Sequence, residues 1–183
     1  ATPIIWYNWF VSSFVFFGIS FLLPLTLKDR NDGEVEENNE SLLTITISSL
    51  GELPTLFLVA IAVHVPFLGR KNTWGISYAL GFITLILVYF EVSFTFFITV
   101  SKLALDMAFT LSYEYTGEIY PTKHRATGLG MAGAFSRIGG IIMPWVGIYI
   151  SKIGLYLPYL IFGISSGIAA VVTFMLPFET RNQ

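Results

Sequence analysis

Long apolar runs separated by short polar connections make up most of this chain. Uncharged runs cover residues 1–27, 72–90 and 153–178. A helix needs about 20 residues to cross the hydrocarbon core of a membrane, which is about 30 Å thick. Apolar runs bounded by charges and turn residues predict six such helices, at 4–27, 42–68, 73–90, 92–113, 126–151 and 154–176. We therefore expect an all-α, multi-pass integral membrane protein with a single six-helix domain over residues 1–183.

The composition excludes several other classes of protein. Hydrophobic residues make up 54% of the chain and charged residues 12%, whereas soluble domains carry about 25% charged residues. The absence of cysteine rules out disulfides, thiolate nucleophiles and cysteine zinc sites. With two histidines far apart and a net charge of −2, neither a metal site nor a nucleic-acid partner is expected. No nucleophile, base and orienting group come together in the sequence, so we expect neither an enzyme nor a cofactor.

Charges between the spans predict the orientation of the helices. Half of the twelve acids fall between Asp29 and Glu40, which predicts an acidic loop over residues 28–41. One side of the predicted topology holds five basic residues and the other holds three: Arg70, Lys71, Lys123, Arg125 and Arg181, against Lys28, Arg30 and Lys152. The positive-inside rule then puts both termini in the cytoplasm or its organellar equivalent, and the acidic loop outside or in a lumen, for a plasma membrane or an organelle membrane alike. Asn39 begins an N-glycosylation sequon in that loop.

Four ionisable residues lie deep within the predicted spans: Glu52, Lys102, Asp106 and Arg137. Charges at such depth are costly and usually face a pathway or a partner. Glu52, Lys102 and Arg137 each lie about 15 Å from the start of their helices, at 1.5 Å per residue. This common level predicts a polar layer where transporters bind substrate. Alternatively the charges form structural pairs, Lys102 with Asp106 and Arg137 with Glu52, or such pairs act as a switch that substrate opens.

Three further features refine the spans. Pro54 follows Glu52 closely and predicts a local helix break beside the acid. Aromatic side chains on the first span, Trp9 and Phe17 among them, either line an organic-substrate pocket or contact lipid. Ala126, Gly130 and Ala134, spaced by four, predict a stripe for close helix packing, and Gly139 with Gly140 extends it.

A long motif at residues 115–130, YTGEIYPTKHRATGLG, resembles one between the tenth and eleventh helices of major facilitator superfamily transporters. The match is to the organic-ion transporter branch and its synaptic-vesicle-related relatives. Other positions agree in order: Trp9-Phe10 with Phe16-Phe17-Gly18, Glu52-Leu53-Pro54, Gly69-Arg70-Lys71 and Leu176-Pro177-Phe178-Glu179-Thr180. The resemblance covers almost the whole chain, as the C-terminal six-helix bundle of such a carrier. Pro66 departs from the pattern, because the family commonly has an acid there.

The resemblance also implies roles for individual residues. Glu118, Arg70 and Arg125 would form cytoplasmic ion pairs that hold one access state. The residue that matches Arg137 is typically acidic in cation carriers and arginine in anion carriers, and Lys102 matches a lysine typical of anion carriers. We therefore expect an organic anion as substrate, with Lys102 and Arg137 as its counter-charges and Asp106 and Glu52 as neighbours that neutralise them or carry a coupled proton.

Two functional hypotheses follow from a single six-helix half. The first is transport of a small organic anion by alternating access, together with an N-terminal six-helix half in the same or another chain. The second is a transporter-derived structural subunit of a larger membrane complex, without transport activity. In both, the partners are membrane lipid and other membrane helices.

Overall fold

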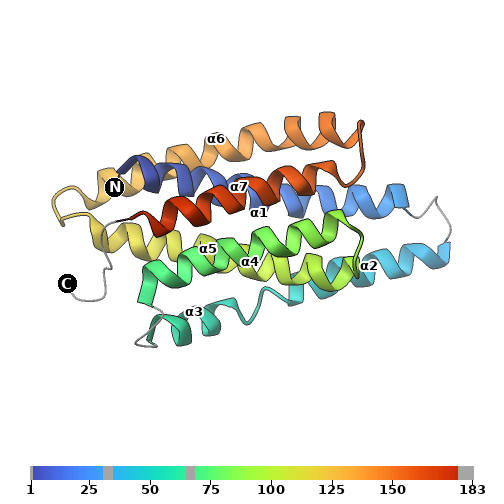
Figure 1. Cartoon of the computed structure of the whole chain (residues 1–183), viewed down its shortest axis with the longest axis horizontal. Coiled ribbons are helices and arrows are strands. Elements are labelled where there is room, and N and C mark those ends of the chain that lie inside the picture. The colour runs from blue at the N-terminus through green and yellow to red at the C-terminus, as the bar shows by residue number, and fades with distance from the viewer. Residues whose placement is uncertain (1, 31–34, 65–68, 177–183) are drawn as a thin grey trace.

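The computed structural model describes the backbone of residues 2–30, 35–64 and 69–176, and the side chains of residues 2–29, 41–64 and 69–176. These residues form an all-helical bundle with no strand among them (Figure 1). The helices are α1 (Thr2–Arg30), α2 (Val35–Leu50), α3 (Thr55–His64), α4 (Gly69–Tyr89), α5 (Phe94–Ile119), α6 (Arg125–Ser151) and α7 (Leu157–Phe174). Six stretches are long and apolar enough to cross a membrane, with α2 and α3 counting together as one. The predicted six-helix membrane fold is confirmed.

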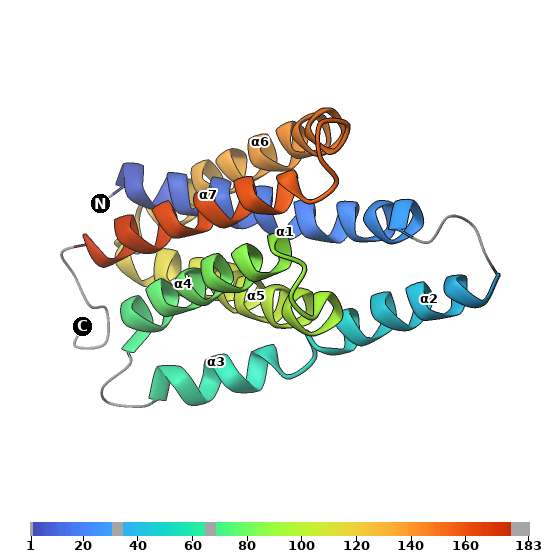
Figure 2. The same cartoon turned by 45° about the vertical axis from the view of Figure 1, so that its right-hand side comes forward.

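The ends of the helices define two ends of the bundle. One end of the bundle holds the start of α1, the end of α3, the start of α4, the α5–α6 connection and the end of α7 (Figure 1). The basic residues Arg70, Lys71, Lys123 and Arg125 belong to this end. The facing ends of α1 and α2 extend beyond the other helices at the opposite end (Figures 1 and 2). Arg30, Asn39 and Arg181 lie outside the residues whose side chains are described.

Two segments are more helical than the sequence suggested. The predicted acidic loop over residues 28–41 is helical at 28–30 and again from Val35, where α2 begins. Likewise α5 continues to Ile119 rather than ending at Tyr113, and it stops just before Pro121, because proline disfavours a helical residue before it.

The second span is interrupted at the predicted position. Pro54 has no N–H to donate to the carbonyl of Leu50, so the N–H of Leu53 bonds to that carbonyl at 3.1 Å instead. The N–H of Thr55 bonds to the carbonyl of Glu52 at 3.0 Å in the same tight, three-residue pattern. Figure 2 shows α2 and α3 as two separate rods joined by this short stretch. The interruption places Glu52 at the junction of the two half-helices.

The bundle is held by close contacts around α1, which packs against α5, α6 and α7. Gly139 of α6 faces α1 so closely that a Cβ atom there would lie 2.5 Å from the carbonyl oxygen of Phe10. The predicted stripe of Ala126, Gly130 and Ala134 is instead exposed on this chain. The close packing predicted for this stripe is therefore not made within the described residues, because spacing by four identifies a face of a helix but not the side toward which it turns.

A groove between α4 and α7 lies in another part of the bundle. It has a volume of about 680 Å³, and its lining contains only apolar side chains and glycine, namely Ala79, Phe82, Ile164, Gly167, Ile168, Ala170, Val171, Val172 and Phe174. We call it the apolar groove.

Candidate functional site

A second groove lies between α1, α5 and α6. Its volume is about 500 Å³, and it is lined by Trp9, Ser13, Phe17, Phe109, Tyr113, Gly133, Ser136, Arg137, Gly140 and Ile141. A hollow of about 490 Å³, which shares Trp9, Tyr113, Gly133 and Arg137, extends toward Leu129 and Gly130 at the start of α6. We call these together the aromatic groove. Small residues of α6 form one wall and leave room beside the rings of α1 and α5.

The rings that line the aromatic groove contact one another. Trp9 meets Tyr113 edge-on, with ring centroids 4.4 Å apart. Phe109 is perpendicular to Tyr113 at 5.4 Å, and Phe17 meets Phe109 at 6.3 Å. Phe109 and Tyr113 are four apart on one face of α5, which is why both reach the groove. Edge-to-face contacts of this kind fix the ring orientations, so the wall presented by α1 and α5 is preorganised.

Trp9 is also anchored by a hydrogen bond. Its indole N–H donates to Thr116 Oγ1 at 2.8 Å, inside the bundle. Trp9 and Phe17, both predicted site residues, therefore reach the same groove, one buried and one exposed.

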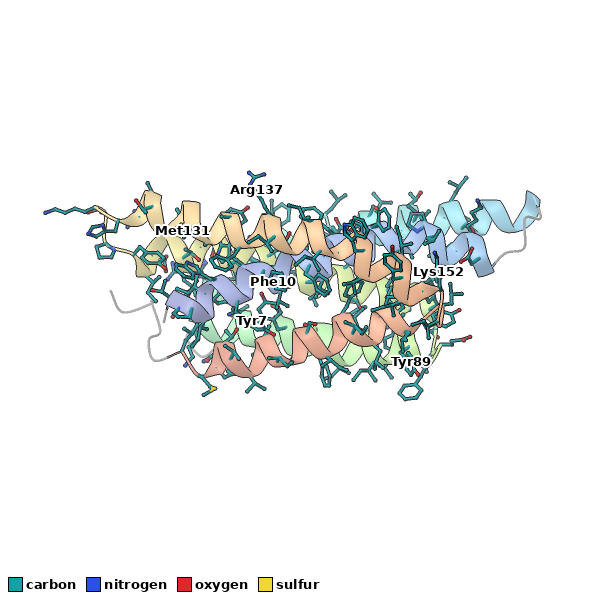
Figure 3. All side chains as sticks on the ribbon, turned by 90° about the horizontal axis from the view of Figure 1, so that it is seen from above. Tyr7, Phe10, Tyr89, Met131, Arg137 and Lys152 are labelled. Carbon is teal, nitrogen blue, oxygen red and sulfur yellow. The ribbon has the colours of Figure 1, made fainter. Side chains whose placement is uncertain are left out.

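Arg137 is the charged residue in the lining of the aromatic groove. Its side chain is exposed, and Figure 3 shows it pointing outward on the side of the bundle opposite α7. No carboxylate of the described residues lies within 4.0 Å of its guanidinium. The predicted pairing of Arg137 with Glu52 is therefore wrong: α2 and α3 pack on α5, whereas α6 packs mainly on α1.

Glu52 pairs with Lys102 instead. Lys102 Nζ lies 2.6 Å from Glu52 Oε1, and the two side chains are 6% and 25% exposed. The break at Pro54 makes this possible, since it places Glu52 at a junction that packs tightly against α5: a Cβ atom on Gly51 would lie 2.5 Å from Thr99 Cγ2. The predicted pairing of Lys102 with Asp106 is therefore replaced by a pairing between helices.

Asp106 connects this ion pair to the aromatic groove. One face of α5 carries four residues of this site, because they are spaced by four, three and four residues: Lys102, Asp106, Phe109 and Tyr113. Asp106 is half-buried and close enough to Glu52 and Lys102 to interact with both charges. Among the described residues no group of three or more histidines or acids is arranged to hold a metal ion.

Another ion pair closes the end of the bundle that carries the basic residues. Arg70 Nη2 lies 2.9 Å from Glu118 Oε1, with side chains 27% and 36% exposed. Glu114, one turn before Glu118 on α5, also interacts with the Arg70 charge. Arg125 is exposed and has no carboxylate within 4.0 Å among the described residues. Pro66 lies outside the described residues.

Comparison with known proteins identifies the fold. The family model described as Major Facilitator Superfamily matches residues 5–183. The chain belongs to the Major Facilitator Superfamily. The resemblance carried by the motif at residues 115–130 is thereby confirmed.

Curated relatives in this superfamily come from the two predicted branches. The chain is 27% identical to "Putative transporter svop-1" of Caenorhabditis elegans, over all of this chain and 38% of that protein. It is 30% identical to "Putative transporter SVOPL" of Danio rerio, over 98% of this chain and 40% of that protein. It is 32% identical to "Solute carrier family 22 member 13" of Homo sapiens, over all of this chain and 31% of that protein. The chain spans less than half the length of these relatives, which are named as transporters or solute carriers and not as enzymes.

Several polar residues of this superfamily member were missed by the sequence analysis. Tyr78 is fully buried, and its hydroxyl donates to the carbonyl of Asn8 at 2.9 Å and bonds to Ser12 at 2.5 Å. Asn8 Nδ2 donates to Thr173 Oγ1 at 2.8 Å, which ties α1 to α7. Asn8 could have been singled out from the sequence, because a side-chain amide within an apolar membrane span must find a hydrogen-bond partner. The amide finds its partner on α7 and the Asn8 backbone carbonyl accepts from Tyr78 on α4, and spacing along α1 reveals neither contact.

Proposed function

We propose that this chain is one half of a membrane carrier for a small organic anion. The observation that supports the proposal is Arg137: an arginine with no carboxylate partner among the described residues, beside aromatic rings in a groove on a membrane-spanning helix. A charge at that depth is costly unless it meets an opposite charge. A guanidinium presents a rigid fork of donors that matches a carboxylate or sulfonate. An organic anion satisfies both conditions, with its apolar part against Trp9, Phe17 and Tyr113.

The Lys102–Glu52 pair has a different role in this proposal. The lysine is almost fully buried and its charge is balanced by Glu52, so the anion binds first at Arg137. Lys102 becomes a second counter-charge only when the pair opens, which makes the pair a switch next to the groove. Opening it without a replacement is expensive, because removing one partner of a buried pair costs about 3–5 kcal/mol.

The proposal includes a second six-helix half, in the same or another chain. Alternating access arises from one half rocking against another around a fixed site, and the aromatic groove is open on this half. The Arg70–Glu118 pair would hold one of the access states, with Arg125 as a partner in the exchange. A purely structural subunit is less consistent with the groove, since it gains nothing from an unpaired arginine at this depth.

The test is uptake of labelled naphthalene-1-sulfonate by proteoliposomes that contain the chain with its second six-helix half. This aromatic monoanion stays charged at any pH of the experiment and does not cross lipid as a neutral acid. Arg137→Gln is expected to reduce uptake about tenfold to a hundredfold, because a hydrogen bond to a charged group is worth about 1.5–3 kcal/mol. Arg137→Lys keeps the charge and should retain part of the uptake.

The matched control is Lys152→Gln, which removes a positive charge at the end of α6, outside the groove lining. It should leave uptake unchanged, and all variants should elute as the intact particle in size-exclusion chromatography. Normal uptake by Arg137→Gln would refute the role of Arg137. Uptake of 1-naphthylmethylammonium in place of the sulfonate would refute the anion class.

A further inference from the structure

The aromatic groove combines a charged rim with two buried serines. At the rim, Arg137 is exposed and points away from the bundle (Figure 3). Ser13 on α1 and Ser136 on α6 belong to the same lining but are only 1% and 8% exposed. We call these two residues the serine pair. The proposed contact with the anion uses the guanidinium at the rim and leaves the serine pair without a role.

The serine pair lies at the contact between α1 and α6. A Cβ atom on Gly140 of α6 would lie 3.5 Å from Ser13 Oγ. The Ser13 hydroxyl therefore lies beside a glycine that is itself part of the groove lining. Ser136 precedes Gly140 by four residues and so lies on the same face of α6. The two serines are thus about one helical turn apart, where one small ligand group can contact both.

Neither hydroxyl of the serine pair has a hydrogen-bond partner among the described residues. Elsewhere in the bundle, buried hydroxyls bond to the carbonyl four residues before: Ser112 to Ala108 at 2.8 Å, and Thr116 to Ser112 at 2.6 Å. This local bond is the ordinary way for a helical serine or threonine to be satisfied. Ser13 and Ser136 do not use it, and a buried hydroxyl without a partner costs free energy. Their hydrogen-bonding capacity is therefore directed to the contents of the groove.

We propose that the serine pair binds an uncharged polar substituent of the transported anion. This inference rests on the proposed transport function and narrows its substrate class. The class is an aromatic anion that carries a hydroxyl, carbonyl or amide group apart from its charge. A serine hydroxyl both donates and accepts, so two of them match any of these groups. The charge stays at Arg137 on the rim, and the substituent points inward.

The substituent is neutral because the groove lining has no further charge to pair with it. Among the described residues that line the groove, Arg137 is the single charged one, and the anionic group of the substrate neutralises it. A second anionic group would lie in the membrane without a counter-charge, which is costly. A cationic group would meet no carboxylate in this lining. A neutral group that forms hydrogen bonds needs only the two hydroxyls.

The serine pair acts on selectivity through the water that a ligand displaces. In an open groove, water is available to both hydroxyls. A ligand with an entirely apolar ring system expels that water and leaves the hydroxyls unpaired, whereas a polar substituent restores their bonds. A site built to bond a substrate hydroxyl discriminates against the analogue that lacks it. We therefore expect the groove to prefer substituted aromatic anions to unsubstituted ones.

The experiment measures equilibrium binding to the chain with its second six-helix half in nanodiscs. The probes are naphthalene-1-sulfonate and its 5-, 6- and 7-hydroxy derivatives, whose hydroxyl stays protonated at neutral pH. At least one derivative should bind about tenfold tighter than the parent anion, since each added hydrogen bond contributes about 0.5–1.5 kcal/mol. The hydroxyl makes a probe more hydrophilic, so partition into lipid predicts the opposite order.

Substitution of the serines tests whether they cause the preference. Ser13→Ala and Ser136→Ala should each reduce the ratio of the two Kd values about threefold, and the double variant should bring it close to one. Arg137→Gln should weaken the binding of the parent and the derivative alike and so keep the ratio. A purely structural role for the serines would not change this ratio in an intact protein.

The matched control is Ser165→Ala. It removes a hydroxyl on α7 that already donates to the carbonyl of Ile161 at 2.9 Å, outside the lining of the aromatic groove. The ratio of the Kd values should stay at the wild-type value. Size-exclusion chromatography of every variant confirms that the particle is intact.

The outcomes separate this inference from the proposed transport. Equal binding of parent and derivatives by the wild-type protein refutes the serine pair as a binding site, and so does a preference that survives in the double variant. In both cases, uptake of naphthalene-1-sulfonate would still support the anion carrier. A preference that depends on the serines, in a protein that takes up none of these anions, would support the serine pair and contradict transport. Binding of no probe at all would refute both.

Discussion

The two grooves of this bundle have similar size and opposite chemistry. The larger hollow of the aromatic groove has a volume of about 500 Å³, and its lining includes Arg137, two serines and a tyrosine. The apolar groove has a volume of about 680 Å³ and contains no charged or polar side chain. A polar group facing lipid has no water to bond with. Under the proposed function, the apolar groove therefore faces the membrane and the aromatic groove faces the interior of the complete carrier. On that proposal the chemistry of the lining, rather than the volume, distinguishes a solute surface from a lipid surface.

The strongest test of this comparison adds one charge to each groove. Ile168 in the apolar groove is 49% exposed and Ile141 in the aromatic groove is 67% exposed. Ile168→Arg should reduce the yield of folded protein sharply, because an arginine facing lipid at mid-span costs about 2.5–3.5 kcal/mol. Ile141→Arg should fold close to normally, since that surface faces a polar interior. The measurement is the folded fraction by fluorescence-detected size-exclusion chromatography, and equal losses in both variants would contradict the assignment.

A smaller effect is expected at the glycines of α6. Gly139→Ala should destabilise the protein by about 1–3 kcal/mol, because the new methyl group meets the backbone of Phe10. Gly130→Ala meets nothing within 4 Å on this chain and should stabilise it by up to about 1 kcal/mol through helix propensity. Chemical unfolding in mixed micelles measures both variants. A destabilised Gly130→Ala would show instead that the exposed stripe packs against another helix.

The smallest effect concerns the wall of the aromatic groove. Trp9→Phe removes the hydrogen bond to Thr116 Oγ1 and should cost about 1 kcal/mol. Trp145→Phe is the control, since that ring is 64% exposed, and it should change the unfolding free energy little. The same unfolding assay applies. If the two substitutions change the unfolding free energy equally, the hydrogen bond from Trp9 to Thr116 contributes nothing to the stability of the groove wall.

The spans were predictable from the sequence because each depends on a long local pattern. The break at Pro54 was predictable for the same reason, since one missing N–H acts within its own helix. The pairing of Glu52 with Lys102, and the absence of a carboxylate partner for Arg137 among the described residues, were not predictable in this way. Depth along a helix follows from counting residues, whereas the direction of a side chain depends on how the helix is rotated against its neighbours. The pair of Glu118 and Arg70 was expected from the family resemblance, which rests on the motif at residues 115–130 and on Gly69-Arg70-Lys71 and carries information that spacing alone does not hold.

The break in the second span also has a mechanical consequence. An unbroken helix behaves as one stiff rod, so a displacement of either end also moves the residues at its middle. When two rods are joined by a short interruption, tilting of either rod displaces the joint least. Here the joint is the stretch that carries Glu52, with α2 on one side of it and α3 on the other. A tilt of either half-helix would therefore displace the buried contact between Glu52 and Lys102 less than any other part of the span.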